Sequence, residues 1–335
     1  MISCLRRAGV DVVERHEPVW EGREQKWSAG LGTVPRLARA QVRLLRPVPG
    51  RFDAVIVGYP GHLDLVAARR AARGAPVVFS PLVSLWDTLV EDRGRFRTDS
   101  AAARALRAVD RRALRAADLV VADTEAHADF LARLAGLPRE RVAVCFVGAE
   151  ERLFGPGWSP SRPPLFVGKL IPLHGLETIL EAARRVPDLR LRVVGSGQLE
   201  PLLARRPANV EWVRWIPYER LPDALRAAAC ALGIFGTGAK AARVIPNKAF
   251  QALACGVPLV TADTPAAREL LVDGESALLV PPGDPDALAG ALRRLSEDRE
   301  LAYRVADGGL SAYRERASED VLGVRWRWLL ENLAR

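Results

Sequence analysis

Residues 233–292 read GIFGTGAKAARVIPNKAFQALACGVPLVTADTPAARELLVDGESALLVPPGDPDALAGAL, and this stretch decides the fold. A glycine-rich loop leads into a helix that we expect at 246–254, because proline suits the first helical position and Gly256 can close the helix in a left-handed conformation. Apolar runs that predict strands follow at 257–263 and 277–281. Helices that alternate with continuously apolar strands predict a parallel sheet covered on both faces.

The same alternation runs along the rest of the chain. Further strands are expected at 11–16, 53–58, 76–80, 118–123, 141–148, 164–168, 189–195, 210–215 and 230–235, and further helices at 61–73, 100–117, 125–135, 176–186, 221–229 and 284–295. The cluster GPGWSPSRPP is the densest in proline and glycine, and it divides the series into two. A chain of 335 residues has room for two domains. We therefore predict an α/β protein with two facing, doubly wound domains.

The boundaries follow from this division. We expect an N-terminal domain at 1–154, a linker at 155–163, a C-terminal domain at 164–315 and a last helix at 316–335 that packs back across the junction. The chain opens with a helix-like segment at 2–7, whereas a doubly wound domain begins with a strand. The N-terminal domain is therefore expected to lack its first strand. Of the two explanations, a misassigned start and a truncated domain, we favour the first, because losing a central strand would unpair its neighbours.

Composition narrows the classes of function. The formal net charge is +9, but arginine is spread along every helix-like segment without a dense basic run. This pattern argues against nucleic-acid binding. A basic face that meets an anionic membrane or a phospholipid acceptor stays open as an alternative.

The cysteines and the apolar runs indicate a compartment. Cysteines 4, 145, 230 and 255 lack the spacing of metal ligands and predict buried free thiols. No run is long and apolar enough to span a bilayer, and the start lacks the apolar segment of a signal peptide. A cytoplasmic location is expected, either free or peripheral on the inner face of a membrane.

A second informative stretch is LFVGKLIPLHGLETILEAA at 165–183. Its strand ends at Gly168, Lys169 follows at the carboxyl end of the strand, and His174 stands at the start of the next helix. A cation, a potential hydrogen-bond donor and free backbone N–H groups together favour an anion site. The alternative is a plain strand–helix turn with a solvated Lys169.

Two further features bear on a ligand. Lys248 lies in the first turn of the helix at 246–254, where a cation opposes the helix dipole unless an anion compensates it. Gly195 and Gly197 follow a strand, but a lone GxG predicts a ligand contact no better than it predicts a tight turn. The acidic residue that a dinucleotide site needs about 20 positions later is missing.

These stretches resemble retaining glycosyltransferases of family four. ALACGVPLVTAD, the AAREL turn and DGESALLVPPGDPDALAGAL are similar to that family's signature, and FVGKLIPLHG is similar to its diphosphate loop. The resemblance is close over 118–315 and looser before it. It implies the GT-B fold of two facing Rossmann-like domains, a nucleoside-diphosphate sugar as donor substrate, and neither a cofactor nor a metal.

The resemblance also implies roles for single residues. Lys169 and His174 stand at the family's two basic positions, whereas Arg243 and Gln251 replace two acidic residues that contact the donor sugar and the ribose. Gln251 can still exchange hydrogen bonds with ribose hydroxyls. Arg243 reverses a charge, so it is expected either to hold phosphate or to select a donor sugar that bears a carboxylate.

The remaining positions complete the predicted site. Trp215 and Ile216 are expected to hold the nucleobase. A histidine of the family's acceptor side is missing, and Asp87, Ser84 and His62 are the nearest polar candidates, with capping of local backbone as the alternative. The predicted catalytic residues are Lys169, Lys248, Arg243 and Asp87. The predicted donor-binding residues are Gly168, His174, Gly195, Gly197, Trp215, Ile216, Gly236, Gly238, Pro246, Asn247 and Gln251.

The implied reaction moves a sugar, with retention at the anomeric carbon, from a nucleoside diphosphate to a glycan, lipid-linked or small-molecule acceptor. Positive groups would stabilise the leaving diphosphate without a metal. The donor phosphate can accept the acceptor's proton, so a protein base is not required. Two alternatives stay open: a non-catalytic nucleotide-sugar-binding or partner subunit of the same fold, and a nucleotide-sugar epimerase.

Overall fold

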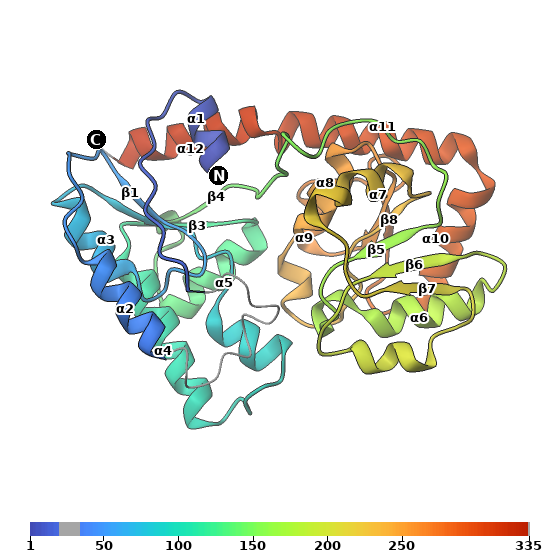
Figure 1. Cartoon of the computed structure of the whole chain (residues 1–335), viewed down its shortest axis with the longest axis horizontal. Helices are drawn as coiled ribbons and strands as arrows, with labels where there is room; N and C mark the ends of the chain where they lie inside the picture. Colours follow the sequence, from blue (N-terminus) through green and yellow to red (C-terminus); the bar gives the residue numbers. More distant parts are fainter. Residues whose placement is uncertain (20–33, 334–335) are drawn as a thin grey trace.

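Two parallel β-sheets organise the chain in the computed structural model, which describes residues 1–19 and 34–333. The first sheet has the strand order β1 (Val55–Val57), β2 (Val77–Phe79), β3 (Leu119–Ala122) and β4 (Val142–Val144). Each of these strands lies inside a run that the sequence predicts. The two sheets with their helices lie side by side in Figure 1.

The strand expected at 11–16 does not form, and that prediction is wrong. Residues 10–18 have neither helix nor strand structure. Val13 is exposed, whereas Val10 and Val12 pack partly buried against the cluster beneath α1 (Ile2–Arg7). The alternating valines therefore serve to hold an irregular segment on a core cluster and do not extend the sheet.

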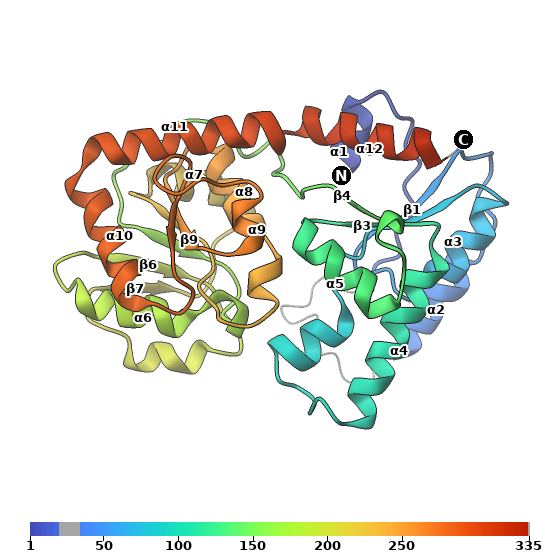
Figure 2. The same cartoon turned by 180° about the vertical axis from the view of Figure 1, so that it is seen from behind.

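Helices cover both faces of the first sheet. One face carries α3 (Leu65–Ala72), α4 (Ala101–Ala116) and α5 (Glu125–Ala135), and the other carries α1 and α12 (Glu319–Leu333). Right-handed crossovers between strands in sequential order place the three connecting helices on the same face. The opposite face, with Val78 and Val121, is closed by helices from the two ends of the chain (Figures 1 and 2). α2 (Val34–Leu44), which the sequence did not predict, contacts α3.

In the second sheet, the strand order switches direction between the two central strands. Its order is β10 (Leu278–Val280), β9 (Leu259–Ala262), β8 (Ala231–Leu232), β5 (Leu165–Val167), β6 (Leu191–Val194) and β7 (Val210–Val213). From β5 the chain adds strands on one side, and from β8 it adds them on the other. In open α/β sheets, ligands bind where the order switches, beyond the carboxyl ends of the two central strands.

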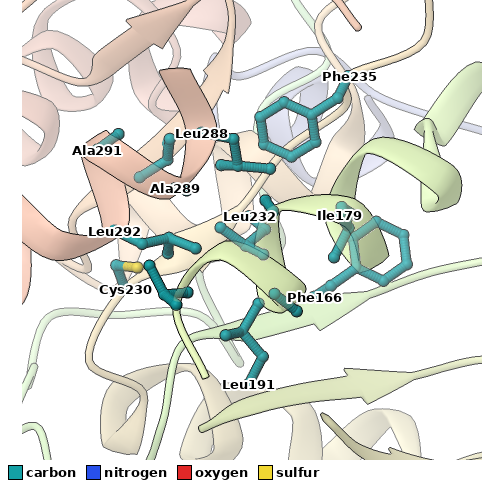
Figure 3. Close-up of a cluster of buried hydrophobic side chains, with 14 of the residues drawn as sticks. Phe166, Ile179, Leu191, Cys230, Leu232, Phe235, Leu288, Ala289, Ala291 and Leu292 are labelled. Carbon is teal, nitrogen blue, oxygen red and sulfur yellow. The ribbon is translucent and has the colours of Figure 1, made fainter. Parts of the chain in front are cut away.

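Two apolar layers hold this sheet between helices. One layer joins the sheet to α6 (Leu176–Arg185) and α10 (Pro285–Glu297), and the other joins it to α7 (Leu221–Ala227), α8 (Asn247–Ala254), α9 (Pro265–Arg268) and part of α11 (Arg299–Arg316). Figure 3 shows the first layer, in which Phe166 and Leu232 from the central strands meet Ile179 of α6 and Leu288 of α10. The rigid centre of the sheet thus lies directly beneath the switch point.

The last helix returns to the first sheet. α12 packs against α1, and its buried Glu319 accepts hydrogen bonds from Ser3 (2.6 Å) and Arg7 (3.1 Å). All four cysteines are free and buried, which confirms the sequence prediction. Within the described residues, no helix combines the length and the apolar character needed to cross a membrane.

Candidate functional site

Two loops meet at the switch point. One follows β5 and contains residues 168–175, and the other follows β8 and contains residues 233–243. A Cβ on Gly175 would lie 2.5 Å from the Phe235 carbonyl carbon, and a Cβ on Gly236 would lie 2.6 Å from the Leu173 oxygen. The two backbones can approach this closely only because both positions are glycine. The fold thereby joins the two stretches that the sequence analysis singled out.

A buried lysine lies at the centre of this junction. Lys248 projects from the first turn of α8, and its Nζ stands 3.8 Å from the centroid of the Phe166 ring. Only 8% of the residue is exposed, and Nζ has no hydrogen-bond partner among the described residues. A Cβ on Gly168 would lie 2.8 Å from this nitrogen. Burial lowers the pKa of the Lys248 amine well below its usual value.

His174 lies beside the same amine. Its Nδ1 contacts the Lys169 carbonyl oxygen, and its ring packs edge-on against Phe166 with 5.7 Å between centroids. Burial, and next the positive charge of Lys248, lowers the pKa of His174 well below its usual value. Lys248 and His174 therefore form a buried basic pair next to Gly168, and the anion site at Lys169 and His174 stays a prediction.

The exposed part of the site surrounds this pair. Lys169 and Asn247 are exposed, and Pro246 is half-buried immediately before α8. The sequence placed Pro246 inside the helix, but the structure begins α8 one residue later with Pro246 as the N-terminal cap. No side chain of a described residue caps α8, so N–H groups of its first turn are available to an anion.

Gly195 and Gly197 have a packing role. A Cβ on Gly195 would lie 1.9 Å from the Gly168 oxygen, and one on Gly197 would lie 2.7 Å from the Leu170 oxygen. The loop after β6 therefore presses directly against the loop after β5. Tight backbone packing, the alternative to a ligand contact, accounts for both glycines.

Substitution of Gly195 by alanine is expected to cost about 3 kcal/mol of unfolding free energy or more, from the clash and from its φ of 154°. Gly238 provides a matched control, because a Cβ there would meet nothing within 4 Å. The Gly238→Ala variant should unfold at the same denaturant concentration as the wild type. Equal stability of the two alanine variants would contradict this account of the loop packing.

The residues predicted to contact the nucleoside lie on neighbouring elements. Trp215 follows β7 and is 72% exposed, and Ile216 beside it is half-buried. Gln251 on α8 is half-buried and hydrogen-bonds with the hydroxyl of Tyr218. The exposed indole and the amide of Gln251 thus belong to segments that flank the same end of the second sheet.

Arg243 and Asp87 bind each other across the two halves of the molecule. The Arg243 guanidinium donates to Asp87 (2.6 Å) and to Glu91 (2.9 Å), and its plane lies 3.8 Å from the Phe130 ring centroid. Lys240 donates to Thr88 at 2.5 Å and lies 3.7 Å from the Asp87 carboxylate. We refer to Asp87, Thr88, Glu91, Lys240 and Arg243 as the Asp87 cluster. Its members from residues 87–91 belong to a short π-helix in the first half, and the two cations belong to the loop after β8.

The pKa of the Asp87 carboxyl is raised above its ordinary value. Burial raises its pKa to about 6, and the charges of Lys240 and Arg243 oppose that shift. A folded-state pKa above the ordinary value of 3.8 means that the folded protein holds this proton more tightly than the unfolded chain does. The resulting stabilisation is complete below pH 3.8 and is lost as the pH rises through about 6.

The Asp87→Asn variant should isolate this effect. The unfolding free energy of the wild type minus that of the variant is expected to fall by about 3 kcal/mol between pH 3 and pH 7, most of it between pH 4 and pH 6, and to stay level above pH 7. For most carboxylates in salt bridges, this difference in unfolding free energy rises with pH instead. A difference that rises with pH would show that the ion pairs outweigh the burial.

Further contacts between the halves escaped the sequence analysis. The Leu173 N–H donates to Asp92 at 2.8 Å, and the Glu269 carboxylate accepts from the N–H groups of Glu125 (2.7 Å) and Ala126 (3.0 Å) at the start of α5. A cavity of about 290 Å³ lies between Glu91 and Asp92 on one side and the residues 172–178 and 235–241 on the other. These carboxylates carry no local sequence signal, because their partners are more than 80 residues away.

The polar candidates of the first half serve the local structure. Asp110, which the sequence analysis missed, is fully buried and accepts hydrogen bonds from the Ser84 hydroxyl and from the N–H groups of Leu85 and Trp86. His62 lies 3.1 Å from the same carboxylate. Ser84 also accepts from the Asp87 N–H, the capping that the alternative reading expected. Among the described residues, no group of three or more His, Cys, Asp or Glu is arranged to hold a metal.

Two family models match the chain. The one described as a glycosyl transferase 4-like domain covers residues 3–148, and the one described as glycosyl transferases group 1 covers residues 163–298. The chain belongs to the group 1 glycosyl transferases. The family resemblance proposed from FVGKLIPLHG and ALACGVPLVTAD is confirmed.

Curated relatives match part of this chain. A D-inositol 3-phosphate glycosyltransferase of Streptomyces bingchenggensis is 30% identical over 304 residues, which are 78% of this chain and 62% of the relative. A phosphatidyl-myo-inositol mannosyltransferase of Mycobacterium leprae is 32% identical over 193 residues, which are 54% of this chain and 44% of the relative. The chain thus spans less than two thirds of the length of either relative.

Solved structures share the fold of this chain. Sucrose-phosphate synthase from Thermosynechococcus elongatus superposes with a TM-score of 0.70 at 18% identity, over 90% of this chain and 78% of that one. Anabaena Alr3699/HepE in complex with UDP-glucose gives 0.68 at 19% identity, over 91% and 84%. The prediction of two facing Rossmann-like domains is confirmed.

Proposed function

We propose that this chain is a retaining glycosyltransferase that moves a sugar from a nucleoside diphosphate to an acceptor with hydroxyl groups. The observation that carries the proposal is the Lys248 amine at the helix terminus of the switch point, which is buried and has no hydrogen-bond partner in the part of the chain that the structure describes. A solitary buried cation is unfavourable unless an anion pairs with it. The doubly charged diphosphate of a nucleotide sugar fits that requirement.

Each part of the site has a place in the reaction. Departure of the nucleoside diphosphate concentrates negative charge on its phosphate oxygens, and groups fixed in advance around them stabilise the transition state most effectively. Lys248, His174, Lys169 and the N–H groups at the start of α8 would form that environment. Trp215 would lie against the base, and Gln251 would exchange hydrogen bonds with the ribose.

The Asp87 cluster is assigned a different task. Arg243 already pairs with two carboxylates, so selection of a carboxylate-bearing donor sugar would require it to leave them. We propose that Arg243 and Asp87 hold the two halves together around the bound donor. A closed cleft would keep water from the reactive sugar.

We propose the classes of donor and acceptor by analogy with the relatives. Alr3699/HepE is described with UDP-glucose, and the curated relatives are named for inositol 3-phosphate and phosphatidyl-myo-inositol. We propose a nucleotide sugar as the donor and a polyol, free, glycan-borne or lipid-linked, as the acceptor. A lipid-linked acceptor would bring the chain to a membrane surface.

A transfer assay tests the proposal. The chain is incubated with UDP-glucose or GDP-mannose, alone and with D-inositol 3-phosphate, methyl glycosides or phosphatidylinositol vesicles. We expect slow release of the nucleoside diphosphate without an acceptor, faster release with one acceptor class, and a product that keeps the donor's anomeric configuration. Donor binding without release of nucleoside diphosphate under any of these conditions would instead identify a binding subunit.

A further inference from the structure

The described residues place no negative charge next to the Lys248 amine. Phe166 presents the face of its ring, and Gly168 presents its backbone. The ionisable side chains that shift the pKa of the neighbouring His174 are Lys248 itself and Arg93 of the first half, and both are bases. Neither a carboxylate nor any other hydrogen-bonding group of the described residues meets Nζ.

His174 cannot compensate the amine. A carbonyl oxygen only accepts, so the contact between Nδ1 and the Lys169 carbonyl requires the hydrogen of the neutral ring to be on Nδ1. The other ring nitrogen then carries a lone pair. Burial lowers the pKa of this imidazole well below its usual value, which favours the neutral ring in the empty site.

The charged form of the amine is therefore disfavoured before a ligand arrives. Removing a lone ammonium from water costs more than the attraction of one aromatic face returns. The lowered pKa of Lys248, which burial causes, agrees with this geometry. A neutral amine cannot stabilise a leaving diphosphate, so the charge must come with the donor.

We propose that the donor binds together with one proton, which converts the Lys248 amine into an ammonium opposite the diphosphate. The inference rests on the proposed function, because it takes the nucleotide sugar as the anion. The nitrogen lone pair forms the new N–H bond with a proton from solvent, and no other bond changes. Binding then follows proton linkage, so the donor's affinity falls by about tenfold per pH unit as the pH rises between the amine's pKa values in the empty and occupied sites.

Calorimetry counts the proton directly. UDP-glucose and GDP-mannose are titrated into the chain in HEPES and in Tris at the same pH, because the two buffers differ in their enthalpy of ionisation. A nucleotide sugar has no group of its own that titrates near neutrality. The observed enthalpies should differ by the amount that corresponds to uptake of one proton per donor bound. Tight binding with equal proton content in the free and bound states would overturn the inference and leave the proposed function standing.

Three variants test which residue binds the proton. Lys248→Met should bind the donor more weakly and take up no proton. Lys248→Arg, whose side chain is always charged, should bind without uptake, and its melting temperature shows whether it is folded. His174→Gln should still take up one proton. Loss of proton uptake in this variant alone would show that the imidazole binds the proton and would overturn the assignment to Lys248. If the wild type binds neither nucleotide sugar at any pH, the proposed function itself fails.

Discussion

Replacement of Lys248 by methionine is expected to lower kcat/KM for sugar transfer by about 100- to 1000-fold, the usual effect of removing one fixed group from a charge-stabilising site. The buried ammonium would face the leaving diphosphate at short range, where solvent screens the charge least. Loss of that charge raises the barrier more than it weakens donor binding. Steady-state release of the nucleoside diphosphate measures the effect.

The second buried lysine provides the control. Lys240 is 6% exposed, like Lys248, but it donates to Thr88 and lies near Asp87. Lys240→Met should lower the melting temperature, because it leaves Asp87 with one cation fewer. Lys248→Met should leave the melting temperature unchanged or raise it, because it removes a buried amine that no group in residues 1–19 or 34–333 hydrogen-bonds. Wild-type activity in the folded Lys248→Met variant would contradict the role assigned to this residue.

Arg243→Gln is expected to cost about 3 kcal/mol of unfolding free energy at neutral pH, because it leaves the Asp87 carboxylate buried with only Lys240 nearby. The same substitution in an Asp87→Asn background should cost much less, since the partner charge is already gone. Denaturant unfolding of the four proteins gives the coupling between the two residues. Additive costs would show that the pair does not hold the halves together.

An exposed pair offers the comparison. Arg97 and Asp99 are joined at 3.0 Å but have side chains that are 85% and 69% exposed. Arg97→Gln should therefore leave stability unchanged within the error of the measurement. The contrast separates the effect of burial from the effect of deleting an arginine.

The sequence predicted features that depend on neighbouring residues. The helix expected at 125–135 has those bounds in α5, because Thr124 caps one end and Gly136 closes the other in a left-handed conformation. Lys248 was recognisable because a cation in the first turn of a helix opposes its dipole. The glycine-rich loop and the diphosphate loop were recognisable from their own motifs, and the strand order then brought them together.

The sequence could not predict features that depend on distant partners. Asp87 and Arg243 were expected in separate roles, and only the fold places their side chains 2.6 Å apart. Gly195 was open to two readings until the position of Gly168 was known. The run at 11–16 satisfied a strand pattern, but Val12 packs with Val10 against the cluster beneath α1 and anchors an irregular segment.

The central claim is that the switch point of the second sheet binds a nucleoside-diphosphate sugar. Amide hydrogen exchange, measured with and without saturating nucleotide sugar, tests it most directly. The account predicts slower exchange at 168–175 and at 236–251, with smaller changes in the first half where the Asp87 cluster meets the loop after β8. Donor binding that leaves these two segments unprotected, or protection confined to the first half, would contradict it.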